Sequence, residues 1–236
     1  MSARDELTIR RSIVESCREM SALGINQGTS GNISVRWHEG LLITPSGLPY
    51  ERMSADDIVP MQLDGTCGHR LKPSSEWRFH CDIMKARADV GAIVHAHPIY
   101  ATAFAICRKE IPAAHYMIAA AGGPTIRCGP YASYGTSELS DIAVAALEGR
   151  NACLLANHGM IATGADLARA MWLAVEVETL CKQYAAALQI GTPHILPDDE
   201  IARTIEKFKT YGPQQETEAT ERLTGFMRFA SAKDNR

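Results

Sequence analysis

Three histidines and one glutamate are the residues of this 236-residue chain best suited to hold a metal ion. His95 and His97 are separated by one residue at the end of an apolar run. Because side chains alternate between the faces of a β-strand, both imidazoles should point the same way, with Cβ atoms roughly 7 Å apart. His158 ends a second apolar run, and Glu76 lies at the start of a predicted helix. This donor set, with a position left for substrate, predicts a catalytic metal site, with Zn²⁺ the first choice and Mn²⁺, Co²⁺ and Fe²⁺ left open by spacing alone.

Small polar residues near these groups predict an anion-binding site, although each also has a plain structural explanation. Ser74 and Ser75 precede Glu76 and are suited to cap a helix that we expect to run to about residue 88. Glu76 alone is also explained by a favourable interaction with the dipole of that helix. Backbone N–H groups and hydroxyls in turns can surround a phosphate without a basic cluster. Together with the two serines, the turn residues suited to this are Gly31, Asn32, Ser46 and Gly47.

The other histidines and the cysteines show no metal-binding pattern. We interpret His38, His69, His80 and His194 as structural or exposed. The seven cysteines are scattered without a C-x-x-C pair, mostly in apolar segments, where a free cysteine behaves as a small hydrophobic residue. Thiols without a disulfide pattern are typical of a reducing compartment, so we expect a cytoplasmic protein.

Composition points to a soluble enzyme-sized domain. The chain is 46% hydrophobic and 22% charged, with a net charge of −3, which argues against a nucleic-acid-binding surface. It contains no apolar run of the roughly 20 residues that a membrane span needs, and its charged N-terminus does not resemble a secretory signal. We expect one domain over residues 1–236, with a flexible tail at about 213–236.

Hydrophobic periodicity predicts interleaved helices and short strands. The predicted helices cover 5–23, 74–88, 98–107, part of 112–123, 136–147, 166–188 and 199–209. The predicted strands cover 33–37, 41–44, 58–63, 90–97, 125–128 and 152–157. This order favours an α/β fold whose mixed sheet is covered by helices on both faces.

Seven segments resemble the class II aldolase/adducin family, and most closely its zinc-dependent L-fuculose-phosphate aldolases. The resemblance extends from about residue 11 to residue 212. The segments are GTSGNISVR (28–36), LLITPSGLPYE (41–51), KPSSEWRFH (72–80), IVHAHPIYATA (93–103), IPAAHYMIAAAGG (111–123), ANHGMI (156–161) and KFKTYG (207–212). The resemblance implies a three-layer αβα fold with a largely antiparallel central sheet. It also implies a homotetramer with active sites between subunits.

The resemblance also assigns roles to individual residues. It makes His95, His97 and His158 the ligands of one zinc ion per subunit. Glu76 becomes the catalytic acid/base, which can also touch the zinc. The six small polar residues named above match phosphate-binding positions, although Ser46 stands where a threonine is expected. Two tyrosines match catalytic positions: Tyr116, which protonates an aldehyde oxygen, and Tyr211, which closes the site from the C-terminal segment.

The implied reaction is reversible cleavage of a ketose 1-phosphate of the L-fuculose 1-phosphate type. The products are dihydroxyacetone phosphate and an aldehyde such as L-lactaldehyde, formed through a metal-stabilised enediolate. A second aldolase hypothesis has 5-deoxyribulose 1-phosphate or 5-methylthioribulose 1-phosphate as substrate. Pentulose-phosphate 4-epimerases of the same family carry aspartate in place of Glu76, which disfavours that activity here. A non-catalytic adducin-like domain is disfavoured because the metal ligands and the acid are all present.

Overall fold

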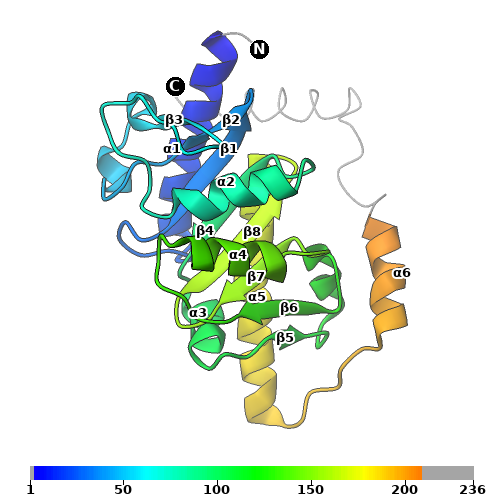
Figure 1. The fold of residues 1–236 in the computed structure, drawn as a ribbon. Coiled ribbons are helices and arrows are strands. Elements are labelled where there is room, and N and C mark those ends of the chain that lie inside the picture. Colours follow the sequence, from blue (N-terminus) through cyan, green and yellow to red (C-terminus); the bar gives the residue numbers. More distant parts are fainter. Residues whose placement is uncertain (1–2, 209–236) are drawn as a thin grey trace, which may run out of the picture.

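A mixed eight-stranded sheet forms the centre of the computed structural model, which describes residues 3–208 (Figure 1). The strands lie in the order β3-β2-β1-β4-β8-β7-β6-β5. Within these residues each neighbouring pair is antiparallel except β6 and β7, so the expected largely antiparallel sheet is confirmed. The strands are β1 Asn32–Trp37, β2 Gly40–Ile43, β3 Val59–Gln62, β4 Ala92–Ala96, β5 Ile111–Pro112, β6 Thr125–Gly129, β7 Ala152–Leu155 and β8 Gly159–Gly164.

Helices cover both faces of the sheet, which confirms the three-layer αβα arrangement (Figure 1). The helices are α1 Ala3–Ala22, α2 Trp77–Ala86, α3 Ile99–Ile106, α4 Ser137–Ala146, α5 Leu167–Ile190 and α6 Asp198–Phe208. Residues 3–208 also contain three short 3₁₀ helices, η1 Tyr50–Arg52 and η2 Ala55–Asp57 between β2 and β3, and η3 Tyr116–Ala121 between β5 and β6. Helices α2 and α4 pack on one face, and α1, α3 and α5 pack on the other. No helix among residues 3–208 is long and apolar enough to cross a membrane.

The alternation of side chains along β4 divides the core into two layers. Val94 and Ala96 are fully buried in the layer beneath α1, α3 and α5. Ile93 is fully buried in the other layer, where Phe79 of α2 packs near it. Burying one such large apolar side chain contributes roughly 1.5–3 kcal/mol. The side chain of His95 shares the face of Ile93, because residues two apart on a strand point the same way, and it therefore lies under α2.

Strand β8 is the main element that the sequence analysis did not predict. The segment is short and has a glycine at each end, and glycines are typical of turns. It forms a strand because it pairs with β4 on one side and β7 on the other. Strand β4 is far away in the chain, and β7 precedes β8 across a short turn. The predicted strand 152–157 is correspondingly too long, since β7 ends at Leu155 and a turn follows. Tyr211 and the tail at 213–236 lie outside the described residues.

Candidate active site

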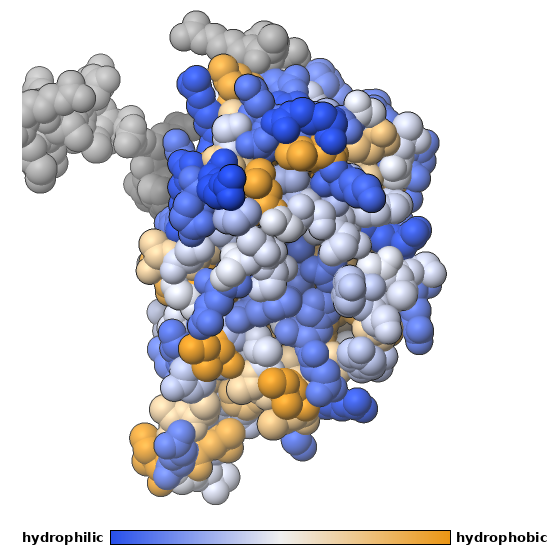
Figure 2. Space-filling view, turned by 90° about the vertical axis from the view of Figure 1, so that its left-hand side faces the viewer, coloured by the Kyte–Doolittle hydropathy of each residue, from blue (hydrophilic) through white to orange (hydrophobic). Residues whose placement is uncertain are grey.

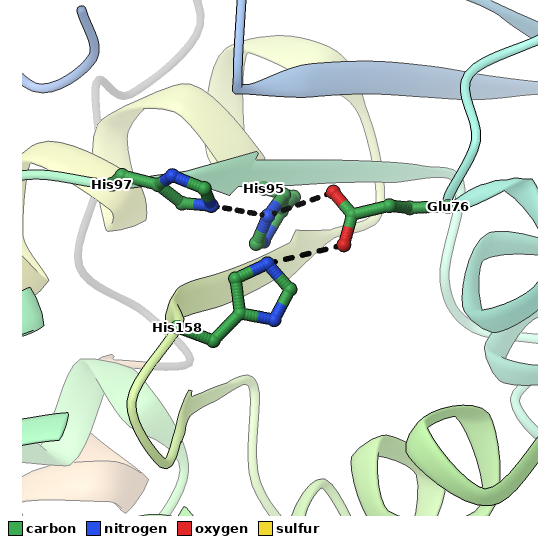
Figure 3. A group of neighbouring side chains, drawn as sticks. All are labelled: Glu76, His95, His97 and His158. Carbon is green, nitrogen blue, oxygen red and sulfur yellow. Dashed lines mark hydrogen bonds and ion pairs between the residues drawn. The ribbon is translucent and has the colours of Figure 1, made fainter. Parts of the chain in front are cut away.

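The structure brings Glu76, His95, His97 and His158 together (Figure 3). One possible ligand atom from each side chain lies within 4.8 Å of all the others. The Nε2 atoms of His95 and His97 are 2.9 Å apart. The two oxygens of Glu76 lie 3.1 Å from Nε2 of His95 and 3.1 Å from Nε2 of His158. Four side chains from three separate parts of the chain thus converge on one point at the end of β4.

Local backbone geometry places two of these histidines. His97 directly follows β4, where Asn26 accepts a hydrogen bond from its backbone N–H at 3.2 Å. His158 lies in the turn between β7 and β8, after Asn157, whose φ of 55° is a left-handed conformation that asparagine tolerates. Gly159 follows, and a Cβ atom there would lie 2.5 Å from Cδ2 of His97. A glycine is therefore required for the two imidazoles to approach each other.

The protonation pattern of His95 fits a metal ligand. Its Nδ1 lies 2.8 Å from the carbonyl oxygen of Met160, which can only accept a hydrogen bond. Nδ1 therefore carries the proton, and the lone pair of Nε2 faces the cluster. A metal-binding histidine typically donates its other N–H to a carbonyl in this way. Oε1 of Glu76 is buried and makes no hydrogen bond, although Nε2 of His158 lies 3.1 Å from it, so this oxygen can still bind a divalent cation.

The cluster favours an ionised glutamate beside a neutral histidine. Burial by itself raises the pKa of Glu76, but attraction to His95 and His158 in their protonated forms outweighs it and holds that pKa well below its ordinary value; a bound cation would supply positive charge at the same place. Burial, together with the rings of His95 and His158, lowers the pKa of His97 to about 3. A charged carboxylate and an uncharged imidazole are the forms that bind metal ions.

The start of α2 differs from the prediction. The helix begins at Trp77, so Glu76, rather than Ser74 or Ser75, occupies the capping position. Its carboxylate makes no capping hydrogen bond, because it turns toward the histidines. The Ser74 hydroxyl instead accepts the backbone N–H of Glu76 at 3.3 Å. A capping hydrogen bond to the helix N-terminus therefore does not explain why the side chain of Glu76 is buried at this position.

An open pocket of about 430 Å³ adjoins the cluster. Its lining includes all the residues expected to bind phosphate: Gly31, Asn32, Ser46, Gly47, Ser74 and Ser75. It also includes Tyr131 and Tyr134, which the sequence analysis did not identify. They lie between β6 and α4 with about half or more of their surface exposed, and no motif or periodicity marks them. Only the folded chain places this loop around the same pocket as Glu76, His97 and His158.

Tyr116 belongs to neither the histidine cluster nor the lining of this pocket. It begins η3, is 50% exposed, and packs its ring 6.4 Å from that of Phe208 in α6. The pocket that residues 3–208 form is lined without Tyr116. One chain therefore supplies the histidine cluster and the pocket without this tyrosine.

Comparisons with known proteins agree with this geometry. The family model described as "Class II Aldolase and Adducin N-terminal domain" matches residues 11–185. A protein of Rhodospirillum rubrum called 5-methylthioribulose-1-phosphate/5-deoxyribulose-1-phosphate aldolase is 54% identical over 206 residues, covering 87% of this chain and 93% of that protein. The L-fuculose phosphate aldolase of Escherichia coli (strain K12) is 50% identical over 205 residues, covering 86% of this chain and 95% of that protein.

A solved structure shares the fold of this chain. An L-fuculose 1-phosphate aldolase superposes with a TM-score of 0.84 at 39% identity, covering 89% of this chain and 98% of that one. The family match spans the strands and helices that carry the four clustered side chains. The chain therefore belongs to the class II aldolase/adducin family and is a class II aldolase.

Proposed function

We propose that the enzyme is a zinc-dependent aldolase that reversibly cleaves a ketose 1-phosphate into dihydroxyacetone phosphate and an aldehyde. The observation that carries this proposal is the buried Glu76 carboxylate, held against three histidines at the edge of an open pocket. The primary candidate substrate is of the L-fuculose 1-phosphate type, with L-lactaldehyde as the aldehyde. The second candidate is 5-methylthioribulose 1-phosphate or 5-deoxyribulose 1-phosphate, which the name of the 54% identical relative favours.

The phosphate end of the substrate is assigned to the side of the pocket next to α2. Ser74 and Ser75 lie immediately before the first turn of that helix, opposite the turn that contains Ser46 and Gly47. Hydroxyls and backbone N–H groups near a helix N-terminus bind phosphate without a formal positive charge. This contact would fix the orientation of the substrate before any bond is broken.

Glu76 is assigned the proton transfer. A divalent cation bound to His95, His97 and His158 would supply Lewis-acid stabilisation of negative charge on the substrate oxygens. In the condensation direction, Glu76 removes one proton from the hydroxymethyl carbon of dihydroxyacetone phosphate. That carbon then bonds to the aldehyde carbon, and Tyr116 donates a proton to the aldehyde oxygen. In cleavage the same bond breaks, Tyr116 recovers its proton, and Glu76 returns a proton to carbon.

A homotetramer would bring Tyr116 to the pocket of a neighbouring chain. Tyr116 lies on the surface of its own chain, outside its own pocket. The same chain exposes large apolar side chains, which are common where subunits meet: Ile99 and Ile106 of α3, and Leu188 and Ile190 of α5. Figure 2 shows hydrophobic side chains gathered at the lower end of one face, where α3 and the end of α5 lie in Figure 1. We propose that this face contributes to the subunit contacts.

Mixing two inactive variants should restore activity if Tyr116 acts across a subunit boundary. Tyr116→Phe lacks the phenolic proton and Glu76→Gln lacks the base, so each homotetramer should cleave substrate slowly. In randomly mixed tetramers, about one site in four would combine an intact Glu76 with the partner subunit's intact Tyr116. Coexpressed variants should therefore reach up to about a quarter of wild-type turnover. The control is a mixture of separately folded, non-exchanging tetramers. Activity no higher than that control would place Tyr116 outside the neighbouring site.

Cleavage of a panel of ketose 1-phosphates tests the proposed reaction and separates its two candidate substrates. The panel contains L-fuculose 1-phosphate, 5-deoxyribulose 1-phosphate and 5-methylthioribulose 1-phosphate. We expect dihydroxyacetone phosphate from at least one of them, with the aldehyde identified by derivatisation and mass spectrometry. The substrate with the highest kcat/KM identifies the tail that the pocket accepts. Release of no aldehyde, together with epimerisation of a pentulose 5-phosphate, would replace the aldolase proposal with an epimerase.

A further inference from the structure

A buried chain of hydrogen bonds ends on the Glu76 carboxylate. The Ser34 hydroxyl lies 2.7 Å from Nδ1 of His80, and Nε2 of His80 lies 2.6 Å from Oδ1 of Asn32. Nδ2 of Asn32 lies 3.0 Å from Oε2 of Glu76. All four side chains are buried, and those of Ser34 and His80 have no exposed surface. His80, which the sequence analysis interpreted as structural or exposed, is therefore linked to the proposed base through one amide.

Strand register and helix spacing place these residues together. Asn32 of β1 lies directly opposite His95 of β4, so their side chains share the sheet face that α2 covers. Ser34 lies two residues along β1 on the same face. His80 lies one helical turn beyond Glu76. Asn32 and Ser34 on β1 thus contact Glu76 and His80 at the start of α2.

The donors in this chain all point toward Glu76. An ionised carboxylate only accepts hydrogen bonds, so Asn32 must present its N–H to Glu76 and its carbonyl oxygen to His80. That oxygen also only accepts, so the proton of His80 is on Nε2. Nδ1 then accepts from the Ser34 hydroxyl. Burial lowers the pKa of His80 to about 3, which agrees with a neutral ring that donates once and accepts once.

We propose that His80 is a positioning residue for proton transfer by Glu76. Its Nε2–H holds the Asn32 amide in the one orientation that donates to the carboxylate. Without that donor, the amide can rotate by half a turn, which places its carbonyl oxygen against Glu76 and repels it. A base displaced by about 1 Å from its working position can cost about a hundredfold in rate. This inference rests on the proposed function, because it assumes that Glu76 transfers the proton.

Two amide substitutions at His80 separate positioning from simple packing. The amide of His80→Gln reaches as far along the side chain as Nε2 of the imidazole, so it can donate to Asn32. The shorter amide of His80→Asn reaches only the Ser34 end. The assay follows hydrogen exchange at the hydroxymethyl carbon of dihydroxyacetone phosphate in deuterated water. We expect His80→Asn to lose about tenfold or more in kcat with KM changed less than about threefold, and His80→Gln to stay within about threefold of wild type. Zinc content should remain near one ion per chain in both.

The double variant with Asn32→Ala tests whether His80 acts through that amide. In the Asn32→Ala background, His80→Asn should cause no further loss of kcat, because the effects of substitutions at two residues that act as one unit do not add. Independent, additive losses would reject the inference, and so would equal exchange by the Asn and Gln variants. If neither variant folds, Ser34→Ala decides: a fall in kcat of a few fold supports the chain, and a wild-type kcat rejects it. Absence of exchange in wild type would reject the proposed function and this inference with it.

Discussion

Glu76→Gln should fold, keep zinc, and exchange the dihydroxyacetone phosphate hydrogen at least about a hundredfold more slowly than wild type. The amide has nearly the shape of the carboxylate but cannot accept the proton from carbon. His95, His97 and His158 would remain to hold the metal. The measurement is proton NMR in deuterated water with dihydroxyacetone phosphate alone, so it needs no aldehyde and no knowledge of the natural substrate. Wild type should exchange a single prochiral hydrogen, because one fixed carboxylate reaches one face of a bound substrate.

Glu138→Gln is the matched control for this variant. Glu138 lies in the first turn of α4, is exposed, and is not part of the metal cluster. If a glutamate near a helix start matters only through the helix dipole, both variants should lose a few tenths to about 1 kcal/mol of stability and keep the wild-type exchange rate. An unchanged exchange rate in Glu76→Gln would therefore remove the base from the proposed mechanism.

His95→Ala should lose the metal and with it all measurable cleavage. His95 is fully buried, and its Nε2 lies close to both His97 and Glu76. Its removal leaves two imidazoles and one carboxylate, and the substitution also leaves the Met160 carbonyl without its partner. An unsatisfied buried acceptor of this kind costs about 1–3 kcal/mol, so the variant should be less stable but folded. Elemental analysis of protein purified without chelator should find about one zinc per wild-type chain and far less in the variant.

The exposed His194 provides the control for metal loss. It lies between α5 and α6, outside the cluster, so His194→Ala should keep the wild-type zinc content and cleavage rate. Treating wild type with a chelator should reproduce the His95→Ala phenotype. Added Zn²⁺ should then restore cleavage in the chelator-treated wild type but not in the His95→Ala variant. Full cleavage by a metal-free sample would contradict the assignment of the four side chains to a catalytic metal site.

The pattern of side chains along the sequence was sufficient for the fold class and for the residues of the cluster. The i, i+2 spacing of His95 and His97 requires only extended backbone to put two imidazoles on one face; β4 carries His95, and His97 directly follows its last residue, although the predicted strand ran to 97. Apolar periodicity likewise identified α5 and the strands β1 and β2 within a few residues. These features depend on local geometry, which a short stretch of sequence contains in full.

Tertiary structure decided the features that depend on pairing between distant segments. Strand β8 forms because β4 and β7 satisfy its backbone, whereas its own short run between two glycines does not by itself predict a strand. The same long-range pairing sets Asn32 opposite His95, which lets one amide join Glu76 to His80. The sequence alone identified His80 only as an isolated histidine, because hydrogen-bond partners 46 and 48 residues away follow no local spacing. Local periodicity determines which face a side chain occupies, and only the folded sheet determines what it meets there.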